Sequence, residues 1–394
     1  MTYNFDEVLD REGTNSVKWN YRGDVFGTED VLPLWVADMD FPCPPSVTEA
    51  LIERAKHPVY GYPGKPEAFY QSLVDWTMRR FNVEVAARRM TPIPGVVTGL
   101  HVAIDAFTKP GDKIVIQPPV YHPFFSAIKN RGRHVVENPL REKNGRYEMD
   151  LADLQDQIDS RTRMIILCSP HNPVGRVWTK EELQELVKLC VKNDIFVVSD
   201  EIHSDLVFEK GTHTPLYSLS QEAADCSLTF VAPSKTFNLA GLATSVGIAG
   251  NERIHREFST AAAKAGLFHI NLFGIEALQV AYNKGEAWLE EVLSYLQKNA
   301  EYIHSFLRDR IPRVTMEVPE ATYLGWMDFR ELNLYGDELN DFIVKRARLG
   351  FNAGAMFGQQ GDGFQRINFA CPRSILTEAM ERLEQAVKEV SNNE

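Results

Sequence analysis

Cysteine is scarce in this chain, and the few cysteines present form no known motif. Five cysteines lie at irregular spacing among 394 residues, without a Cys-x-x-Cys pair. Ten histidines are also scattered, and the His-Glu-x-x-His pattern of zinc enzymes does not occur. A metal centre and a disulfide framework therefore have little support. We expect a reduced, cytoplasmic protein.

Long runs of basic residues and of apolar residues are also missing. The formal net charge is −12, and no apolar stretch approaches the roughly 20 residues that a membrane helix needs. Because nucleic acids and anionic lipids are bound through clustered positive charge, neither is an expected partner. Residues 1–6 show no basic region followed by an apolar one, so no signal peptide is expected.

The chain does contain enough apolar residues for a large core. Hydrophobic residues make up 44% of the 394 residues, which favours two domains over one. Residues 1–45 read as an irregular N-terminal segment that packs with the smaller domain. Residues 46–285 alternate between helical and strand-like patterns, which predicts an α/β domain with a mainly parallel sheet covered by helices on both faces. Residues 286–394 predict a smaller α+β domain.

The clearest single element is a helix over residues 179–194. Thr179 and Glu182 form a capping box, and an apolar face follows at helical spacing. Further helices are expected at 46–57, 66–81, 98–108 and 286–310, and strands at 113–116, 164–168, 195–198, 228–231, 322–329 and 365–370.

Three consecutive expected strands are each followed by a polar side chain, namely Asn172, Asp200 and Lys235. Ligands of open α/β sheets bind at the carboxyl ends of strands, so these three side chains are expected to converge. Burial there favours the neutral, nucleophilic form of a lysine amine, which can form a Schiff base. An isolated lysine would be interpreted as a surface residue, and its two companions favour the catalytic interpretation.

Asn, Asp and Lys in this order, about 30 residues apart, suit a site for pyridoxal 5′-phosphate (PLP). Lys235 would bond the aldehyde carbon of the cofactor. Asp200 would pair with the pyridine nitrogen and keep it protonated, and Asn172 would donate to the phenolate oxygen. The predicted cofactor is therefore PLP.

Several segments along almost the whole chain resemble the fold-type I, aspartate-aminotransferase-like PLP enzymes. More narrowly, they resemble the MalY/PatB branch of cystathionine β-lyases, or C–S lyases. The segments are 34–41 (LWVADMDF), 60–62 (YGY), 94–97 (PGVV), 118–121 (PPVY), 200–203 (DEIH), 232–241 (APSKTFNLAG) and 366–372 (RINFACP). The resemblance implies a PLP-dependent transferase-like fold.

The resemblance also implies roles at the cofactor phosphate. The loop with Gly95, Val96 and Val97 would offer amide donors at a helix start, although glycine turns before helices are common. Ser234 would donate its hydroxyl. Tyr62 matches a tyrosine that reaches the phosphate in the neighbouring subunit, with a packing role as the alternative.

The remaining implied roles concern the ring and the substrate. Tyr121 would stack on the pyridine ring, and core packing is its alternative. His203 occupies a position where many aminotransferases carry tyrosine and the MalY/PatB branch carries histidine. Arg366 would clamp the substrate α-carboxylate with two parallel hydrogen bonds, or else lie on the surface of an edge strand. We assign no role to His122.

One segment departs from the pattern of many relatives. They carry arginine or lysine about eight residues after the Schiff-base lysine, whereas residues 242–245 here are Leu-Ala-Thr-Ser. Phosphate binding is then expected to depend on amides and hydroxyls. Tyr62 and segment 266–271, which resembles a segment lining the neighbour's site, imply a homodimer with shared active sites.

The expected activity is PLP-dependent β-elimination from an amino-acid substrate, L-cystathionine or a related cysteine conjugate, which yields a thiol, pyruvate and ammonia. An aminotransferase of the same fold is the alternative, because the two reactions share their first steps. A regulatory protein that binds a transcription activator is an alternative of another class.

Overall fold

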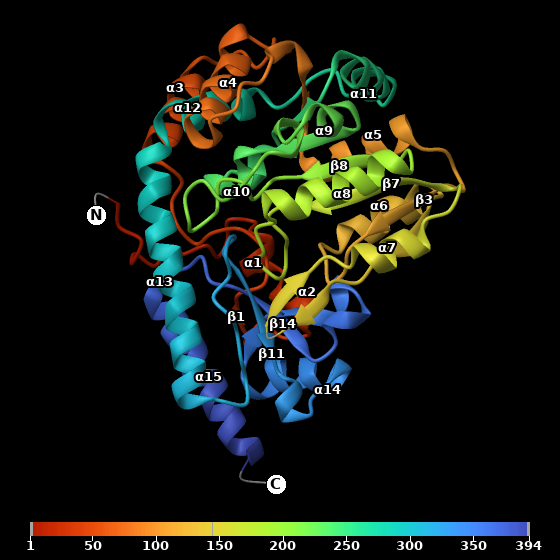
Figure 1. Ribbon diagram of the computed structural model, residues 1–394. Helices are drawn as coiled ribbons and strands as arrows, with labels where there is room; N and C mark the ends of the chain where they lie inside the picture. The colour runs from red at the N-terminus through yellow and green to blue at the C-terminus, as the bar shows by residue number, and fades with distance from the viewer. Residues whose placement is uncertain (1–2, 144, 392–394) are drawn as a thin grey trace.

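A seven-stranded sheet forms the centre of the upper part of the molecule in Figure 1. The computed structural model describes residues 3–143 and 145–391. Strand β10 runs antiparallel to both of its neighbours, and the other pairings are parallel. The predicted α/β fold with a mainly parallel sheet is therefore confirmed. In sheet order the strands are β2 (Met90–Ile93), β10 (Ser245–Ala249), β9 (Ser227–Val231), β8 (Phe196–Asp200), β7 (Thr162–Cys168), β3 (Lys113–Ile116) and β4 (His134–Glu137).

Helices cover both faces of this sheet because its strands are apolar on both sides. In β3, Ile114 and Ile116 face one core cluster and Val115 faces another, as the two-residue period of a strand requires. The first cluster includes side chains of α5 (Val96–Phe107), α6 (Pro123–Asn130) and α11 (Glu252–Lys264). The second includes side chains of α7 (Leu151–Gln157), α8 (Lys180–Lys192) and α9 (Gln221–Asp225).

Helix α8 begins where the sequence predicts a helix start. Thr179 accepts a hydrogen bond from the amide of Glu182 at 3.2 Å, and the Glu182 carboxylate accepts one from the amide of Thr179 at 2.8 Å. The expected capping box is present, and it supplies partners for two amides that would otherwise lack them.

A smaller antiparallel sheet lies below the first in Figure 1, in the order β11 (Leu324–Asp328), β14 (Phe364–Asn368), β13 (Asn352–Ala353). Two long helices, α13 (Glu286–Arg310) and α15 (Arg373–Ser391), pack against each other. Helix α13 runs along both parts of the molecule (Figure 1). The domain boundaries near 45 and 285 remain predictions.

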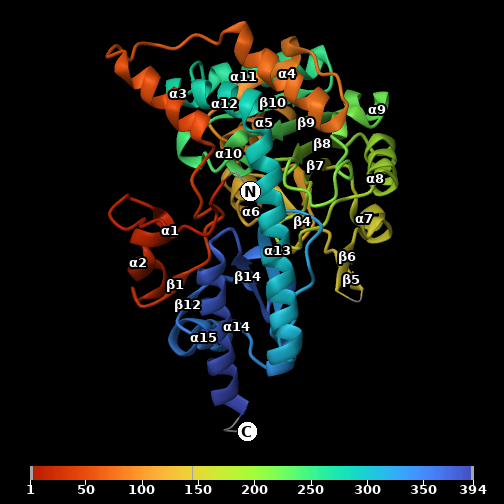
Figure 2. The ribbon, with the colours of Figure 1, turned by 90° about the vertical axis from the view of Figure 1, so that its left-hand side faces the viewer.

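The N-terminal segment has more structure than the sequence indicates. It contains α1 (Val17–Asn20), α2 (Arg22–Phe26) and β1 (Leu32–Pro33). Strand β1 pairs in parallel with β12 (Leu349–Gly350), so this segment lies beside the smaller sheet (Figure 2). Elements this short have too few residues to show a periodic pattern.

The other α-helices and strands of the described residues are α3 (Pro45–Lys56), α4 (Glu67–Phe81), β5 (Arg141–Lys143), β6 (Arg146–Glu148), α10 (Pro233–Thr236), α12 (Leu272–Lys284) and α14 (Gly336–Asp341). No helix within residues 3–143 and 145–391 is both long enough and apolar enough to cross a membrane.

Candidate active site

A cavity of about 230 Å³ opens at the carboxyl ends of β7, β8 and β9. Nine of the eleven predicted site residues line it: Gly95, Val96, Val97, Tyr121, Asn172, Asp200, His203, Ser234 and Lys235. Because three parallel strands end at the same edge, side chains far apart in sequence meet there. The predicted convergence of Asn172, Asp200 and Lys235 is what the structure shows.

The first turn of α5 forms one wall of this cavity. Gly95 precedes the helix with φ of 102°, in the left-handed region that favours glycine, and no side chain of the described residues caps the helix. The first amides of a helix have no carbonyl partner within it. A Cβ atom at Gly99 would lie 2.4 Å from the Phe230 ring, so α5 sits close over β9. The wall therefore presents free amide donors at a fixed place.

Lys235 lies on α10, directly after β9. Its Nζ atom donates to the carbonyl oxygen of Ala37 at 2.6 Å. Burial lowers the pKa of this amine to about 8, the nearby Arg366 acts in the same direction, and Asp38 opposes both. A substantial fraction of the amine is therefore neutral near pH 8.

Asp200 ends β8 and is 4% exposed. Its Oδ1 atom accepts a hydrogen bond from the amide of Ile202 at 3.2 Å. Within the described residues no cation forms an ion pair with this carboxylate, and burial raises its pKa to about 7. The carboxylate therefore lies at the cavity without an ion-pair partner among the described residues, and the charge of Lys235 acts on it only from a longer distance.

His203 lies in the turn after β8 and is also buried. Burial lowers the pKa of its imidazole to about 3, and the positive charges of Lys235 and Arg366 act in the same direction. Its Nδ1 atom has no hydrogen-bond partner among the described residues. The His203 ring, which lines the cavity, is therefore neutral near pH 7.

Arg366 does not line the cavity but contacts a residue that does. It lies on β14 and is 3% exposed. Its Nη1 atom donates to Asn172 Oδ1 at 3.1 Å, and its Nη2 atom donates to the Trp35 carbonyl at 3.0 Å and to Asn352 Oδ1 at 2.6 Å. All three acceptors are neutral, and Nε is buried without a partner in the described part of the chain. Burial lowers the pKa of this guanidinium to about 10.

Tyr62 lies outside the cavity of its own chain. It is 90% exposed, and its ring centre is 5.1 Å from that of His269. Tyr60 similarly contacts Phe273, at 5.9 Å between ring centres. The two segments that the sequence links to a neighbouring subunit, around 60–62 and 266–271, are therefore adjacent on the surface.

Several residues of the site were not predicted from the sequence. Ala37 contributes a backbone carbonyl, which no side-chain pattern reveals, although segment 34–41 stood out as a motif. Thr244 lines the cavity, in the segment 242–245 that contains no lysine or arginine. Tyr323 donates from its hydroxyl to the same Ala37 carbonyl at 2.9 Å.

The chain is similar to several known proteins over nearly its full length. The curated cystathionine beta-lyase PatB of Bacillus subtilis is 42% identical over 385 residues, which cover 98% of this chain and 100% of that protein. The crystal structure of cystalysin from Treponema denticola, which contains PLP, has a TM-score of 0.96 at 36% identity and covers 99% of this chain and 100% of that one. The PLP-bound C–S lyase from Staphylococcus hominis has a TM-score of 0.90 at 32% identity, with 98% of each chain covered.

The sequence pattern of the family described as Aminotransferase class I and II matches residues 29–383. With the full-length relatives, this match confirms the resemblance found in the sequence. The chain belongs to the aminotransferase class I and II family.

Proposed function

We propose that the protein is a PLP-dependent carbon–sulfur β-lyase that cleaves L-cystathionine or a related cysteine conjugate to a thiol, pyruvate and ammonia. The observation that carries the proposal is the placement of Lys235, Asp200 and the start of α5 around one cavity. Full-length similarity to a curated cystathionine beta-lyase and to a C–S lyase structure supports the choice of reaction.

The cavity complements three parts of PLP. The uncapped start of α5 offers amide donors, with the hydroxyls of Ser234 and Thr244 nearby, and suits the phosphate. The buried carboxylate of Asp200, which forms no ion pair within the described residues, suits the protonated ring nitrogen. The Lys235 amine, with its lowered pKa, suits the aldehyde carbon. Tyr121 and Asn172 would then contact the ring and its phenolate oxygen.

PLP, when bound, draws electrons from the Cα atom of an attached amino acid and so stabilises the negative charge that develops there. The residues of the chain supply the proton transfer. Once it is free, the Lys235 amine takes the Cα proton as general base, because its pKa of about 8 leaves a neutral fraction near neutral pH. Asp200, opposite a positive charge, would remain ionised, since such a charge lowers the pKa of a carboxylate.

Arg366 is the proposed anchor for the substrate carboxylate. It is a buried cation whose acceptors are all neutral, and its Nε atom is unused by the described residues. A buried charge without a counter-ion is costly in free energy, so the binding of a carboxylate beside it would be strongly favourable. The hydrogen bond from Arg366 to Asn172, which lines the cavity, supports this assignment.

The proposed working unit is a homodimer. Val59, Tyr60, Tyr62 and Phe268 are each more than half exposed, and ring contacts join their two segments. Exposed apolar patches of this kind are typical of protein interfaces. Tyr62 is 90% exposed and does not line the cavity of its own chain, which supports the proposal that its hydroxyl serves the phosphate bound by the other subunit.

The test is to incubate the purified, PLP-loaded protein with L-cystathionine and no keto acid, and to assay pyruvate. We expect steady pyruvate formation by the wild type and none by a Lys235→Ala variant. Amino transfer that requires a keto acid, with no pyruvate from cystathionine, would support an aminotransferase instead and contradict the proposal.

A further inference from the structure

The carbonyl oxygen of Ala37 accepts two hydrogen bonds from two different parts of the chain. Lys235 Nζ donates at 2.6 Å and the hydroxyl of Tyr323 donates at 2.9 Å. Tyr323 is 1% exposed and directly precedes β11. Because a carbonyl oxygen has two lone pairs, these two donors fill its capacity. The amine and the tyrosine therefore share one acceptor.

The backbone that carries this carbonyl is held from two sides. The amide of Asp38 donates to the Val36 carbonyl at 2.9 Å, which makes a tight turn centred on Ala37. Asn368 Nδ2 donates to the carbonyls of Val36 and Asp38, both at 2.6 Å. On the other side, Asn238 exchanges two hydrogen bonds of 3.0 Å with the backbone of Met39. Since Asn238 follows Lys235 by three residues, the turn is tied to the lysine segment itself.

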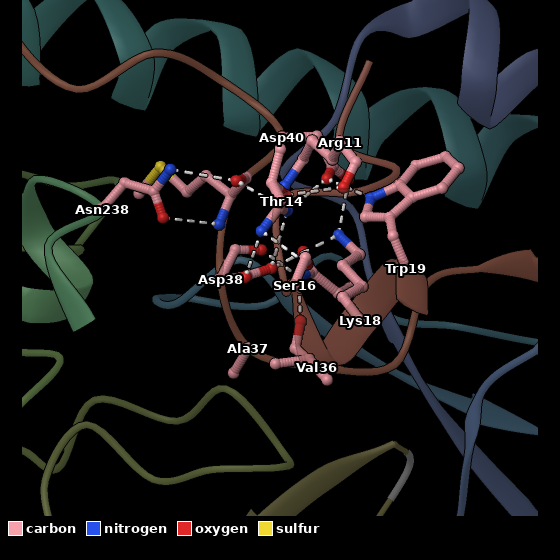
Figure 3. Close-up of polar contacts among 12 residues, drawn as sticks. Arg11, Thr14, Ser16, Lys18, Trp19, Val36, Ala37, Asp38, Asp40 and Asn238 are labelled. Carbon is pink, nitrogen blue, oxygen red and sulfur yellow. Dashed lines mark hydrogen bonds and ion pairs between the residues drawn. The ribbon is translucent and has the colours of Figure 1, made fainter. Parts of the chain in front are cut away.

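A partly buried ionic cluster, in which Lys18 and Asp40 are buried and Arg11 and Asp38 are half-buried, fixes the side chains of the same turn (Figure 3). Arg11 bonds to Asp38 at 2.7 Å and to Asp40 at 2.6 Å. Lys18, which is fully buried, bonds to Asp40 at 2.5 Å. Removing one partner of such a pair leaves an uncompensated buried charge, so the cluster resists rearrangement. The position of the Ala37 carbonyl is therefore set independently of the lysine.

We propose that Tyr323 is a positioning residue for Lys235: it shares the Ala37 carbonyl, so that this buried acceptor stays hydrogen-bonded when the amine leaves to react. The inference rests on the proposed function of Lys235 as the lysine that bonds PLP. With Tyr323 in place, departure of the amine does not leave a buried carbonyl without a donor. The turn therefore gives the free amine a hydrogen-bond acceptor, and the amine can leave it at low cost because Tyr323 remains bonded to the same carbonyl.

The proposal predicts a change in the proton affinity of the amine when the hydroxyl is lost. The groups that act on this amine are Asp38, Asp200, Arg366 and His203, together with Tyr323 through the shared carbonyl. In a Tyr323→Phe variant, Lys235 becomes the sole side-chain donor to Ala37 among the described residues. A stronger hydrogen bond from the charged amine favours its protonated form, which raises its pKa. Capture of PLP, which needs the neutral amine, then slows below that pKa.

The experiment follows cofactor capture rather than turnover. Apoprotein is mixed with PLP at pH 6 to 10, the reaction is stopped with borohydride at timed intervals, and the fraction of modified Lys235 peptide is measured by mass spectrometry. For Tyr323→Phe we expect the pH midpoint of the capture rate to rise by about half a unit, which slows capture about threefold below the midpoint. Tyr147→Phe is the matched control, because the Tyr147 hydroxyl is also buried and bonded but its partner is the Trp326 indole at 3.1 Å, not the Ala37 carbonyl.

A second variant moves the midpoint in the opposite direction. Asp38 favours the charged amine, so Asp38→Asn lowers the pKa of Lys235 and shifts the midpoint down. Asp38→Asn therefore serves as a control that the capture assay reports the proton affinity of Lys235. If Tyr323→Phe does not fold, Tyr323→Leu, which also removes the hydroxyl, takes its place and is expected to raise the midpoint. A folded variant without the hydroxyl that keeps the wild-type midpoint and rate overturns the inference. Label on a different lysine in the wild type would instead refute the proposed function.

Discussion

The Nη1 atom of Arg366 donates to the Oδ1 atom of Asn172 at 3.1 Å, and this hydrogen bond joins the smaller sheet to the cavity at the edge of the larger one. Arg366 comes from β14, and Asn172 follows β7. The proposed substrate anchor and a proposed cofactor contact therefore have a fixed relation. If Arg366 holds the carboxylate of a substrate, the Cα atom of that substrate would face the cavity that Lys235 lines.

We expect Arg366→Lys to raise KM for cystathionine far more than it lowers kcat. An ammonium cannot make the two parallel hydrogen bonds of a guanidinium. Losing one charge-assisted bond costs about 1.5–3 kcal/mol, equivalent to an increase in KM of about 10- to 100-fold. Steady-state kinetics measure the split, and Arg330→Lys is the control, since Arg330 pairs with Asp328 and Glu142 outside the site. An unchanged KM would exclude Arg366 as the anchor.

Asp200→Ala is expected to lower kcat by on the order of 10²–10³-fold while the fold is retained. Without the carboxylate, the ring nitrogen of the cofactor has no partner to keep it protonated. Asp328→Ala is the control, because Asp328 also ends a strand but pairs with Arg330. Circular dichroism and bound PLP content are measured alongside turnover. Near wild-type turnover in a folded, PLP-loaded variant would show that Asp200 has another role.

Gly99→Ala tests whether the start of α5 is held by its close approach to the sheet. A Cβ atom there would lie 2.4 Å from the ring of Phe230, and overpacking of this kind costs about 1–3 kcal/mol. Urea unfolding of the apoprotein should report a loss in this range. At Gly241, where a Cβ would meet nothing within 4 Å, substitution by alanine should change stability little. Equal stability of both variants would mean that the helix can move away from β9.

Tyr62→Phe is expected to weaken PLP retention by about 1 kcal/mol, roughly fivefold, through the loss of one hydrogen bond. Tyr60→Phe is the control, because the Tyr60 hydroxyl donates to the Ala55 carbonyl of its own chain at 2.9 Å. Equilibrium dialysis measures retention.

A mixed dimer of Tyr62→Phe and Lys235→Ala chains then tests the direction of the contact. If Tyr62 acts on the other subunit, the site with the intact lysine also receives an intact tyrosine, and its PLP retention returns to the wild-type value. Retention that stays weak in the mixed dimer would place Tyr62 in its own site. A fully active monomer in light scattering would exclude the shared site altogether.

The part of the site that was predictable is the part made of side chains at strand ends. Asn172, Asp200 and Lys235 follow buried apolar strands, and the topology of parallel sheets requires such positions to meet. The Ala37 carbonyl was not predictable, because every residue has one and only the folded turn aims it at the lysine. From the sequence, Tyr323 would be interpreted as a core aromatic residue, because it precedes a buried strand. Its hydroxyl bonds to a backbone atom 286 residues away, and no local pattern reveals such a partner. The sequence of β10 likewise contains no local pattern that would show that this strand runs antiparallel to its neighbours.

The most direct test of the account is to find the lysine that bonds the cofactor. The wild-type protein is loaded with PLP, reduced with borohydride to make the bond to the lysine permanent, digested, and its peptides are mapped by mass spectrometry. The account predicts a yellow protein before reduction and one modified peptide, with the added mass on Lys235 and none in the Lys235→Ala variant. A label on another lysine, or no label at all, would contradict it.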